Sequence, residues 1–158
     1  MASKSCLPNT SSQPDRVDTA TDKQLRDSLE ALHNHEQSDG QPVGITGFSL
    51  GAFEALSLLK EIPVQVGALV IFYGTFDTVY PASHAPVLGH FAETDEFEPL
   101  SEQKKLEQAL GAGGATVFYT YPGTGHWFFE ADQSAYNAAA AELAWQRTLE
   151  FLNTHLKR

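Results

Sequence analysis

The stretch VGITGFSLGA, residues 43–52, decides the fold class of this chain. It starts as a short apolar segment, turns at Ser49 and continues from Leu50 as an apolar helical pattern. The motif Gly47-x-Ser49-x-Gly51 therefore stands in the strand–turn–helix setting that holds an exposed, strained serine at a strand end. The two glycines would let strand and helix approach closely. A tight turn without chemistry is the alternative interpretation of the same residues.

Three further apolar runs predict strands that are covered on both faces, as in a parallel sheet. Helical patterns precede, separate and follow these runs, and Ser101 is expected to cap the third helix, which Gly111 would end. The alternation predicts a three-layer α/β fold with a mostly parallel sheet of about four strands flanked by helices. The expected strands are residues 43–48, 66–73, 86–92 and 115–121, and the expected helices are residues 21–36, 50–60, 101–110 and 136–156.

Length and composition favour one globular domain. The chain has 158 residues, and residues 1–20 are polar, so we expect a mobile arm followed by a single domain over residues 21–158. The formal net charge of −10 argues against binding of nucleic acid or anionic membranes, because no basic surface would displace counterions. The single cysteine, Cys6, and the absence of an apolar signal segment predict a cytoplasmic protein.

Two polar residues follow later strands and fit the serine. A serine nucleophile needs a base within hydrogen-bond reach and a group that orients the base. His126 ends the glycine-rich loop 123–126 after the fourth strand, and Asp95 follows the third. The carboxyl ends of parallel strands meet at one edge, where ligands bind. The order Ser49, Asp95, His126 is that of α/β-hydrolase triads. Asp77 is a competing orienter, and a solvated loop histidine is the plainer alternative for His126.

Other residues are candidates for contact with a substrate. The Leu50 N–H would lie at a helix N-terminus and stabilise a developing oxyanion. Trp127, Phe128 and Phe129 suggest an apolar substrate wall, with core packing under the last helix as the alternative. We expect no cofactor, because no phosphate-binding or dinucleotide motif is present. We also expect no metal, because three residues lack recognised metal-site spacing: His84, His90 and Glu93.

Between about residues 41 and 156 the chain resembles the dienelactone hydrolase family of α/β-hydrolases. The resemblance implies a shortened α/β-hydrolase fold and a serine-type hydrolase that cleaves a small ester or lactone. It assigns Ser49 as nucleophile, Asp95 as triad acid and His126 as base. Its most specific parts are GITGFSLGA (44–52), HFAETDEFEP (90–99), YPGTGHWFF (121–129) and SAYNAAAAELAWQRTLEFL (134–152).

Two departures from the family concern the site. The founding enzymes carry cysteine where this chain has Ser49, and a hydroxyl needs stronger activation than a thiol. Family enzymes that act on the anionic dienelactone hold its carboxylate with arginines, one of them four residues after the triad histidine. Glu130 occupies that position here and would repel an anionic substrate.

A third departure concerns the sheet. The family carries several strands before the nucleophile strand, and a loop among them supplies the second oxyanion N–H. Only a polar arm and one helix precede Val43, so we expect an exposed sheet edge and association of two copies through it. The alternatives are a catalytically weak or inactive family member that acts as a binding or assembly module, and a truncated gene model.

Overall fold

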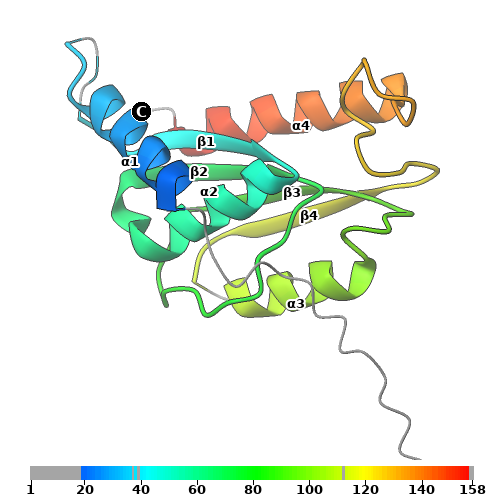
Figure 1. Cartoon of the computed structure of the whole chain (residues 1–158), viewed down its shortest axis with the longest axis horizontal. Helices are drawn as coiled ribbons and strands as arrows, with labels where there is room; N and C mark the ends of the chain where they lie inside the picture. The colour runs from blue at the N-terminus through cyan, green and yellow to red at the C-terminus, as the bar shows by residue number, and fades with distance from the viewer. Residues whose placement is uncertain (1–18, 37, 39, 112, 157–158) are drawn as a thin grey trace, which may run out of the picture.

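A computed structural model of the chain describes residues 19–156 except 37, 39 and 112 (Figure 1). The predicted arm over residues 1–20 thus falls almost wholly outside the described residues. Four parallel strands form one sheet whose spatial order follows the chain order. The predicted parallel sheet is therefore confirmed. Its strands are β1 (Val43–Phe48), β2 (Val66–Phe72), β3 (Val87–Ala92) and β4 (Thr116–Tyr121).

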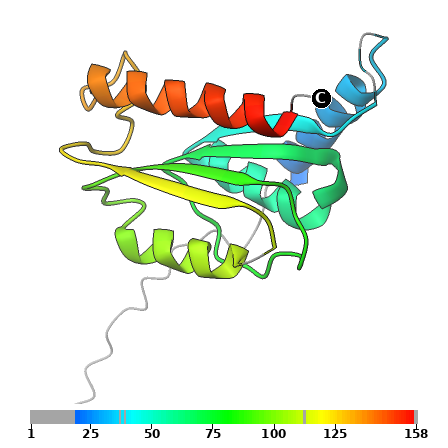
Figure 2. The ribbon, with the colours of Figure 1, turned by 180° about the vertical axis from the view of Figure 1, so that it is seen from behind.

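Helices cover both faces of the sheet and make the three predicted layers. Figures 1 and 2 show α4 along one face, with α2 and α3 on the opposite face. A salt bridge between Arg26 and Glu61 joins α1 to the end of α2. No helix among the described residues has the length and apolar content needed to cross a membrane. The helices are α1 (Thr19–His33), α2 (Leu50–Glu61), α3 (Leu100–Leu110) and α4 (Ala138–Leu156), with a short 3-10 helix, η1, at Pro63–Gln65.

The hydrophobic core lies in two parts, one on each face of the sheet. The first part joins the sheet to α2 and α3 and includes Leu56 and Leu106. The second joins the sheet to α4 and includes Phe72 and Phe151. The central strands β2 and β3 are buried almost throughout, which explains their continuous apolar sequences. The outer strands β1 and β4 consist mainly of half-buried and exposed positions, with one buried residue in each.

The ends of α3 test two predictions of capping. The expected cap at Ser101 is wrong, because α3 begins at Leu100 and Pro99 takes the N-cap position without a side-chain hydrogen bond. Proline fixes φ near the value found here, −64°, and so starts the helix one residue earlier. The expected end at Gly111 is confirmed: its φ of 52° suits glycine, and its N–H donates to the Glu107 carbonyl.

Candidate active site

Ser49 lies on a sharp turn between β1 and α2. Its φ of 50° and ψ of −117° are rare for a residue with a side chain and cost about 1–3 kcal/mol. Close packing holds this turn, because a Cβ at Gly47 would lie 2.4 Å from the Gly51 carbonyl oxygen, and one at Gly74 would lie 2.6 Å from the backbone carbonyl oxygen of Ser49. The Ser49 side chain makes no capping bond to α2. Its hydroxyl is therefore available to another partner.

That partner is His126. The Ser49 Oγ lies 3.0 Å from His126 Nε2, and His126 Nδ1 lies 2.7 Å from Asp95 Oδ2. A carboxylate can only accept, so Nδ1 carries the proton and Nε2 is left to accept the Ser49 O–H. The His126 and Asp95 side chains are only 6% and 1% exposed. The structure thus brings together the three residues that the sequence selected for a triad, in the order serine–imidazole–carboxylate.

Asp95 is held in place from its other oxygen. Its Oδ1 accepts the backbone N–H groups of Phe97 and Glu98, at 2.9 and 3.0 Å. Burial opposes ionisation of this carboxyl, but the hydrogen bonds from His126 and from the backbone outweigh burial and lower its pKa. Asp95 is therefore a fixed anion beside the imidazole. Asp77, the competing acid, is exposed to solvent.

Leu50 is the first residue of α2, directly after the serine. Its N–H belongs to the first turn of a helix, where N–H groups have no partner within the helix. The partial positive charge of a helix N-terminus adds to this donor. An oxygen that gains negative charge next to Ser49 would therefore meet one suitably placed N–H from the elbow itself.

The three aromatic residues after His126 have different surroundings. Trp127 is 39% exposed, and its ring packs edge-on against the His126 ring at 4.7 Å. Phe128 is fully buried in the core beneath α4, as the packing alternative expects. Phe129 is half-buried, and its ring is tilted against that of Phe48 at a centroid distance of 5.5 Å. Among these three residues, Trp127 alone combines an exposed ring with contact to the candidate triad.

Sequence reasoning missed two aromatic rings beside His126. Phe97 is 56% exposed, and its ring lies 5.0 Å from the His126 ring. Tyr73 is fully buried, and its ring lies 4.8 Å from the same imidazole. Phe97 stands two residues after Asp95, and this position could have predicted that its ring lies near the site. Tyr73 ends an apolar run whose sequence gives no such signal.

One more carboxyl lies beside the site. Glu98 follows Asp95 by three residues, and its Oε2 accepts the Thr75 hydroxyl at 2.5 Å. Burial raises the pKa of Glu98, although the bonds from Thr75 oppose this shift. Glu130, four residues after His126, accepts a hydrogen bond from the Tyr73 hydroxyl. Both acids thus accept hydrogen bonds from hydroxyl groups of residues that follow β2.

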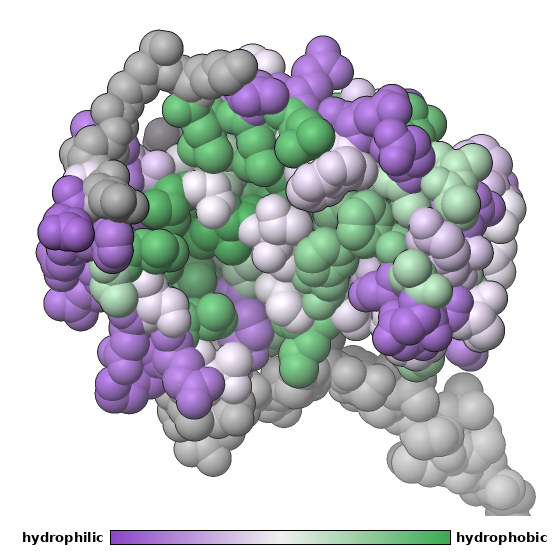
Figure 3. Space-filling view, turned by 90° about the horizontal axis from the view of Figure 1, so that it is seen from above, coloured by the Kyte–Doolittle hydropathy of each residue, from purple (hydrophilic) through white to green (hydrophobic). Residues whose placement is uncertain are grey.

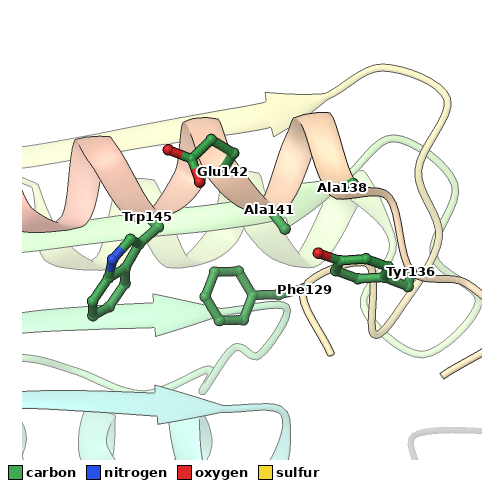
Figure 4. A pocket seen from close by; sticks show the side chains of 6 residues that line it. All are labelled: Phe129, Tyr136, Ala138, Ala141, Glu142 and Trp145. Carbon is green, nitrogen blue, oxygen red and sulfur yellow. The ribbon is translucent and has the colours of Figure 1, made fainter. Parts of the chain in front are cut away.

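A pocket of about 390 Å³ lies at the start of α4, and none of the three candidate triad residues lines it (Figure 4). Phe129 stands between this cavity and Phe48, the residue before Ser49. In Figure 4 the rings of Phe129, Tyr136 and Trp145 form its wall. The residues that line it are Phe129, Tyr136, Ala138, Ala141, Glu142 and Trp145.

The residues considered as metal ligands have other partners. Both ring nitrogens of His84 lie near backbone carbonyls, those of Ala85 and Leu110. His90 lies between two hydroxyl groups, and Glu93 accepts the N–H of Gly123. Within the described ranges, no group of three or more histidine, cysteine or acidic side chains is arranged to hold a metal ion.

Comparison with known proteins gives one family. A model of the dienelactone hydrolase family matches residues 9–156. A carboxymethylenebutenolidase from Pseudomonas putida is 31% identical over 123 residues, which are 75% of this chain and 51% of that protein. The same-named protein from Rhodococcus opacus is 31% identical over 149 residues, which are 85% of this chain and 59% of that protein. The chain thus spans about half the length of the curated relatives it matches.

Solved structures agree with the sheet and helices described above. A candidate dienelactone hydrolase from Klebsiella pneumoniae superposes with a TM-score of 0.69 at 25% identity, covering 82% of this chain and 60% of that one. The α/β-hydrolase MGS-M1, from a deep-sea metagenome library, gives a TM-score of 0.78 at 16% identity, covering 92% and 69%. The second similarity concerns the fold alone.

Proposed function

This chain belongs to the dienelactone hydrolase family, and we propose that it cleaves a small ester or lactone through Ser49, His126 and Asp95. The observation that carries the proposal is the continuous hydrogen-bonded series from the Ser49 hydroxyl to the Asp95 carboxylate, with distances of 3.0 and 2.7 Å. These distances are within the reach that proton transfer requires.

In the proposed reaction the Ser49 oxygen attacks the carbonyl carbon while His126 Nε2 takes the hydroxyl proton. The bond to the leaving alcohol breaks as His126 returns that proton to the alcohol oxygen. Water then cleaves the acyl-serine ester by the same two steps, and Ser49 regains its proton. Asp95 remains ionised and stabilises the imidazolium that forms in each half-reaction.

The Leu50 N–H is the proposed donor to the oxyanion. It is a single donor from the elbow, and the second donor of the family comes from a segment that precedes the nucleophile strand. Loss of one oxyanion donor costs about 2.7–4 kcal/mol of transition-state stabilisation. We therefore expect measurable but slow turnover from the residues described here.

The proposed substrate is neutral. Glu130 accepts a hydrogen bond from Tyr73, whose ring packs on the His126 imidazole, and its carboxylate would repel an anionic lactone. The exposed rings of Trp127 and Phe97 would contact an apolar group of the substrate. Phe128 and Phe129 belong to the packing behind these rings. The proposed compartment is the cytoplasm, since the only cysteine is Cys6.

The central test is hydrolysis of p-nitrophenyl acetate by the wild type and by Ser49→Ala. We expect the variant to lose at least about 10³-fold in kcat, because the nucleophile is gone. A fluorophosphonate probe should also label the wild type at Ser49 and leave the variant unlabelled. Equal rates for the two proteins would exclude the serine mechanism. An unlabelled wild type would favour the binding or assembly module instead.

A second pair of variants tests the orienting acid. Asp95→Asn should lower kcat by about 10³–10⁴-fold, because an amide N–H facing Nδ1 favours the wrong imidazole tautomer. Asp77→Asn is the matched control, an acid after the neighbouring strand that is exposed to solvent. Its kcat should stay at the wild-type value. A comparable loss in both variants would contradict the assignment of Asp95.

We also propose that two copies associate through β1. Among the described residues β1 pairs with β2 alone, so its other edge presents unpaired backbone groups. The side of α4 next to β1, called the outer flank here, is apolar and consists of Trp145, Leu149, Leu152 and Leu156. Figure 3 shows hydrophobic residues gathered over the middle of this face of the molecule, between hydrophilic ends. A two-fold axis through paired β1 edges would bring the two outer flanks together.

A further inference from the structure

Tyr73 leaves the regular course of β2. Its φ is 36°, in the left-handed region that bulky residues rarely occupy. Alternation along a strand would send Phe72 and Tyr73 to opposite faces, yet both belong to the core on the α4 side. The Tyr73 N–H still donates to the His90 carbonyl at 2.8 Å, so the residue remains attached to β3. The unusual backbone thus directs the Tyr73 ring toward the His126 loop.

The Tyr73 ring packs against the buried side of the His126 imidazole. Its centroid lies 4.8 Å from that of His126, and its side chain is fully buried. The other two rings on His126, those of Phe97 and Trp127, are both exposed. Among the three, Tyr73 is the one whose own position is fixed by the core, where Phe128 packs against it at 5.6 Å.

The Tyr73 hydroxyl reaches the other end of the same loop. It donates a hydrogen bond to the carboxylate of Glu130. The loop between is a turn, since the Glu130 N–H donates to the Trp127 carbonyl at 3.1 Å and Trp127 has a φ of 64°. Burial, together with the Glu130 carboxylate, raises the pKa of Tyr73 well above its usual range. The phenol therefore stays a hydrogen-bond donor across the working pH range.

We propose that Tyr73 and Glu130 are a positioning pair that holds the His126 imidazole between Ser49 and Asp95. The ring backs the imidazole, and the hydroxyl ties down the turn that follows it. His126 stands on a loop rather than on a helix or strand, so its orientation depends on such contacts. The kinetic effect of the pair rests on the proposed hydrolase function, whereas its effect on the His126–Asp95 hydrogen bond does not.

The first experiment observes the His126–Asp95 hydrogen bond by NMR in the absence of substrate. The His126 Nδ1 proton should give a low-field proton NMR resonance, assigned by its loss in His126→Gln. Tyr73→Phe and Glu130→Ala should shift or broaden this resonance, because each removes the tie between ring and turn. Glu130→Gln should retain it, since an amide oxygen still accepts from the Tyr73 hydroxyl. The matched control is Tyr80→Phe, which deletes another buried hydroxyl, one that donates to the Phe76 carbonyl at 2.9 Å on the opposite face of the sheet.

The second experiment measures kcat and KM for p-nitrophenyl acetate in the same variants. We expect about a tenfold loss of kcat in Tyr73→Phe and Glu130→Ala, with KM unchanged, and no further loss in the double variant. Tyr80→Phe should lower the unfolding midpoint and leave kcat unchanged. If Tyr73→Phe keeps both the wild-type resonance and the wild-type kcat, the pair is overturned while the hydrolase stands. If neither the wild type nor any variant hydrolyses p-nitrophenyl acetate, yet the resonance shifts as expected, the proposed hydrolase function is wrong and the positioning pair stands.

Discussion

At the scale of one residue, His90 joins three elements of the fold. Its Nδ1 lies 2.7 Å from the Tyr121 hydroxyl of β4, and its Nε2 lies 3.0 Å from the Thr148 hydroxyl of α4. The side chain is fully buried in β3. Burial lowers the pKa of His90 to about 3, and the charge of Arg147 adds to this effect. His90 is thus a neutral structural histidine rather than a site residue.

His90 should therefore contribute to the loss of stability in acid. The unfolded chain binds a proton at this residue below a pKa of 6.5, whereas the folded protein does so only below about 3. As the pH falls between these values, this residue should lower the free energy of unfolding by about 1.4 kcal/mol per pH unit. In His90→Gln that contribution disappears. Urea unfolding of both proteins across this pH range checks the difference, and parallel curves would contradict it.

The sequence could predict Ser49, Asp95 and His126, because each stands in a local pattern at a strand end. Their approach to one another follows from the parallel sheet, whose carboxyl ends share an edge. Tyr73 could not be predicted, because an apolar run does not reveal that its last residue takes a positive φ and turns toward the histidine loop. The hydrogen bond to Glu130 depends on that turn and was hidden for the same reason.

At the scale of elements, the junction of β1 and α2 contains two glycines that differ in how closely other atoms approach them. A Cβ at Gly47 would lie 2.4 Å from the Gly51 carbonyl oxygen and 2.8 Å from the Ala52 Cα, both backbone atoms. A Cβ at Gly51 would meet nothing within 4 Å. Only the first glycine is therefore required for the close approach of strand and helix.

The two alanine variants should move stability in opposite directions. Gly47→Ala should destabilise the protein by about 3 kcal/mol or more, because strand and helix would have to separate. Gly51→Ala should be neutral or stabilise by up to about 1 kcal/mol, because alanine is the better helix former. Urea unfolding midpoints of the two variants check this. A similar loss in both would mean that the elbow does not depend on this contact.

Element types were predicted from apolar periodicity, whereas some element ends were not. The first helix was expected over residues 21–36, but it spans Thr19–His33. Its last expected turn contains only polar side chains, which have no apolar surface to pack on and so do not hold a helical turn. The start of α3 before Ser101 has a local cause in Pro99. Ends of elements thus follow contacts and backbone constraints that periodicity does not report.

At the scale of the whole molecule, the three layers could be predicted, but the exposed side of α4 could not. Leu143 and Leu149 are each 42% exposed and occur in one apolar pattern. Arg147, four residues after Leu143, stacks 3.7 Å from the Tyr119 ring of β4. Leu152, three residues after Leu149, lies close to Gly44 of β1. Leu143 and Leu149 therefore lie on opposite flanks of α4, one toward β4 and the other toward β1. The sequence could not predict this, because it depends on how α4 packs on the sheet.

These flanks provide a matched test of the proposed association through β1. Leu149→Glu should convert a dimer to a monomer, because it places a charge in the joined outer flanks. Leu143→Glu, with the same exposure on the other flank, should leave the dimer intact. Light scattering at high micromolar concentration gives both masses. A wild-type protein that is monomeric there would refute the proposal.

The order of the sheet also has a consequence for the time course of folding. Each strand pairs with the strand before it in the chain, so the sheet can grow in the order of synthesis. The serine elbow belongs to the first pair, the Asp95 loop follows the third strand, and His126 emerges only after β4. A nascent chain that has formed β1 to β3 therefore carries an exposed serine without its base. On the proposed function, Ser49 would become reactive only after β4 and the His126 loop have docked on the sheet.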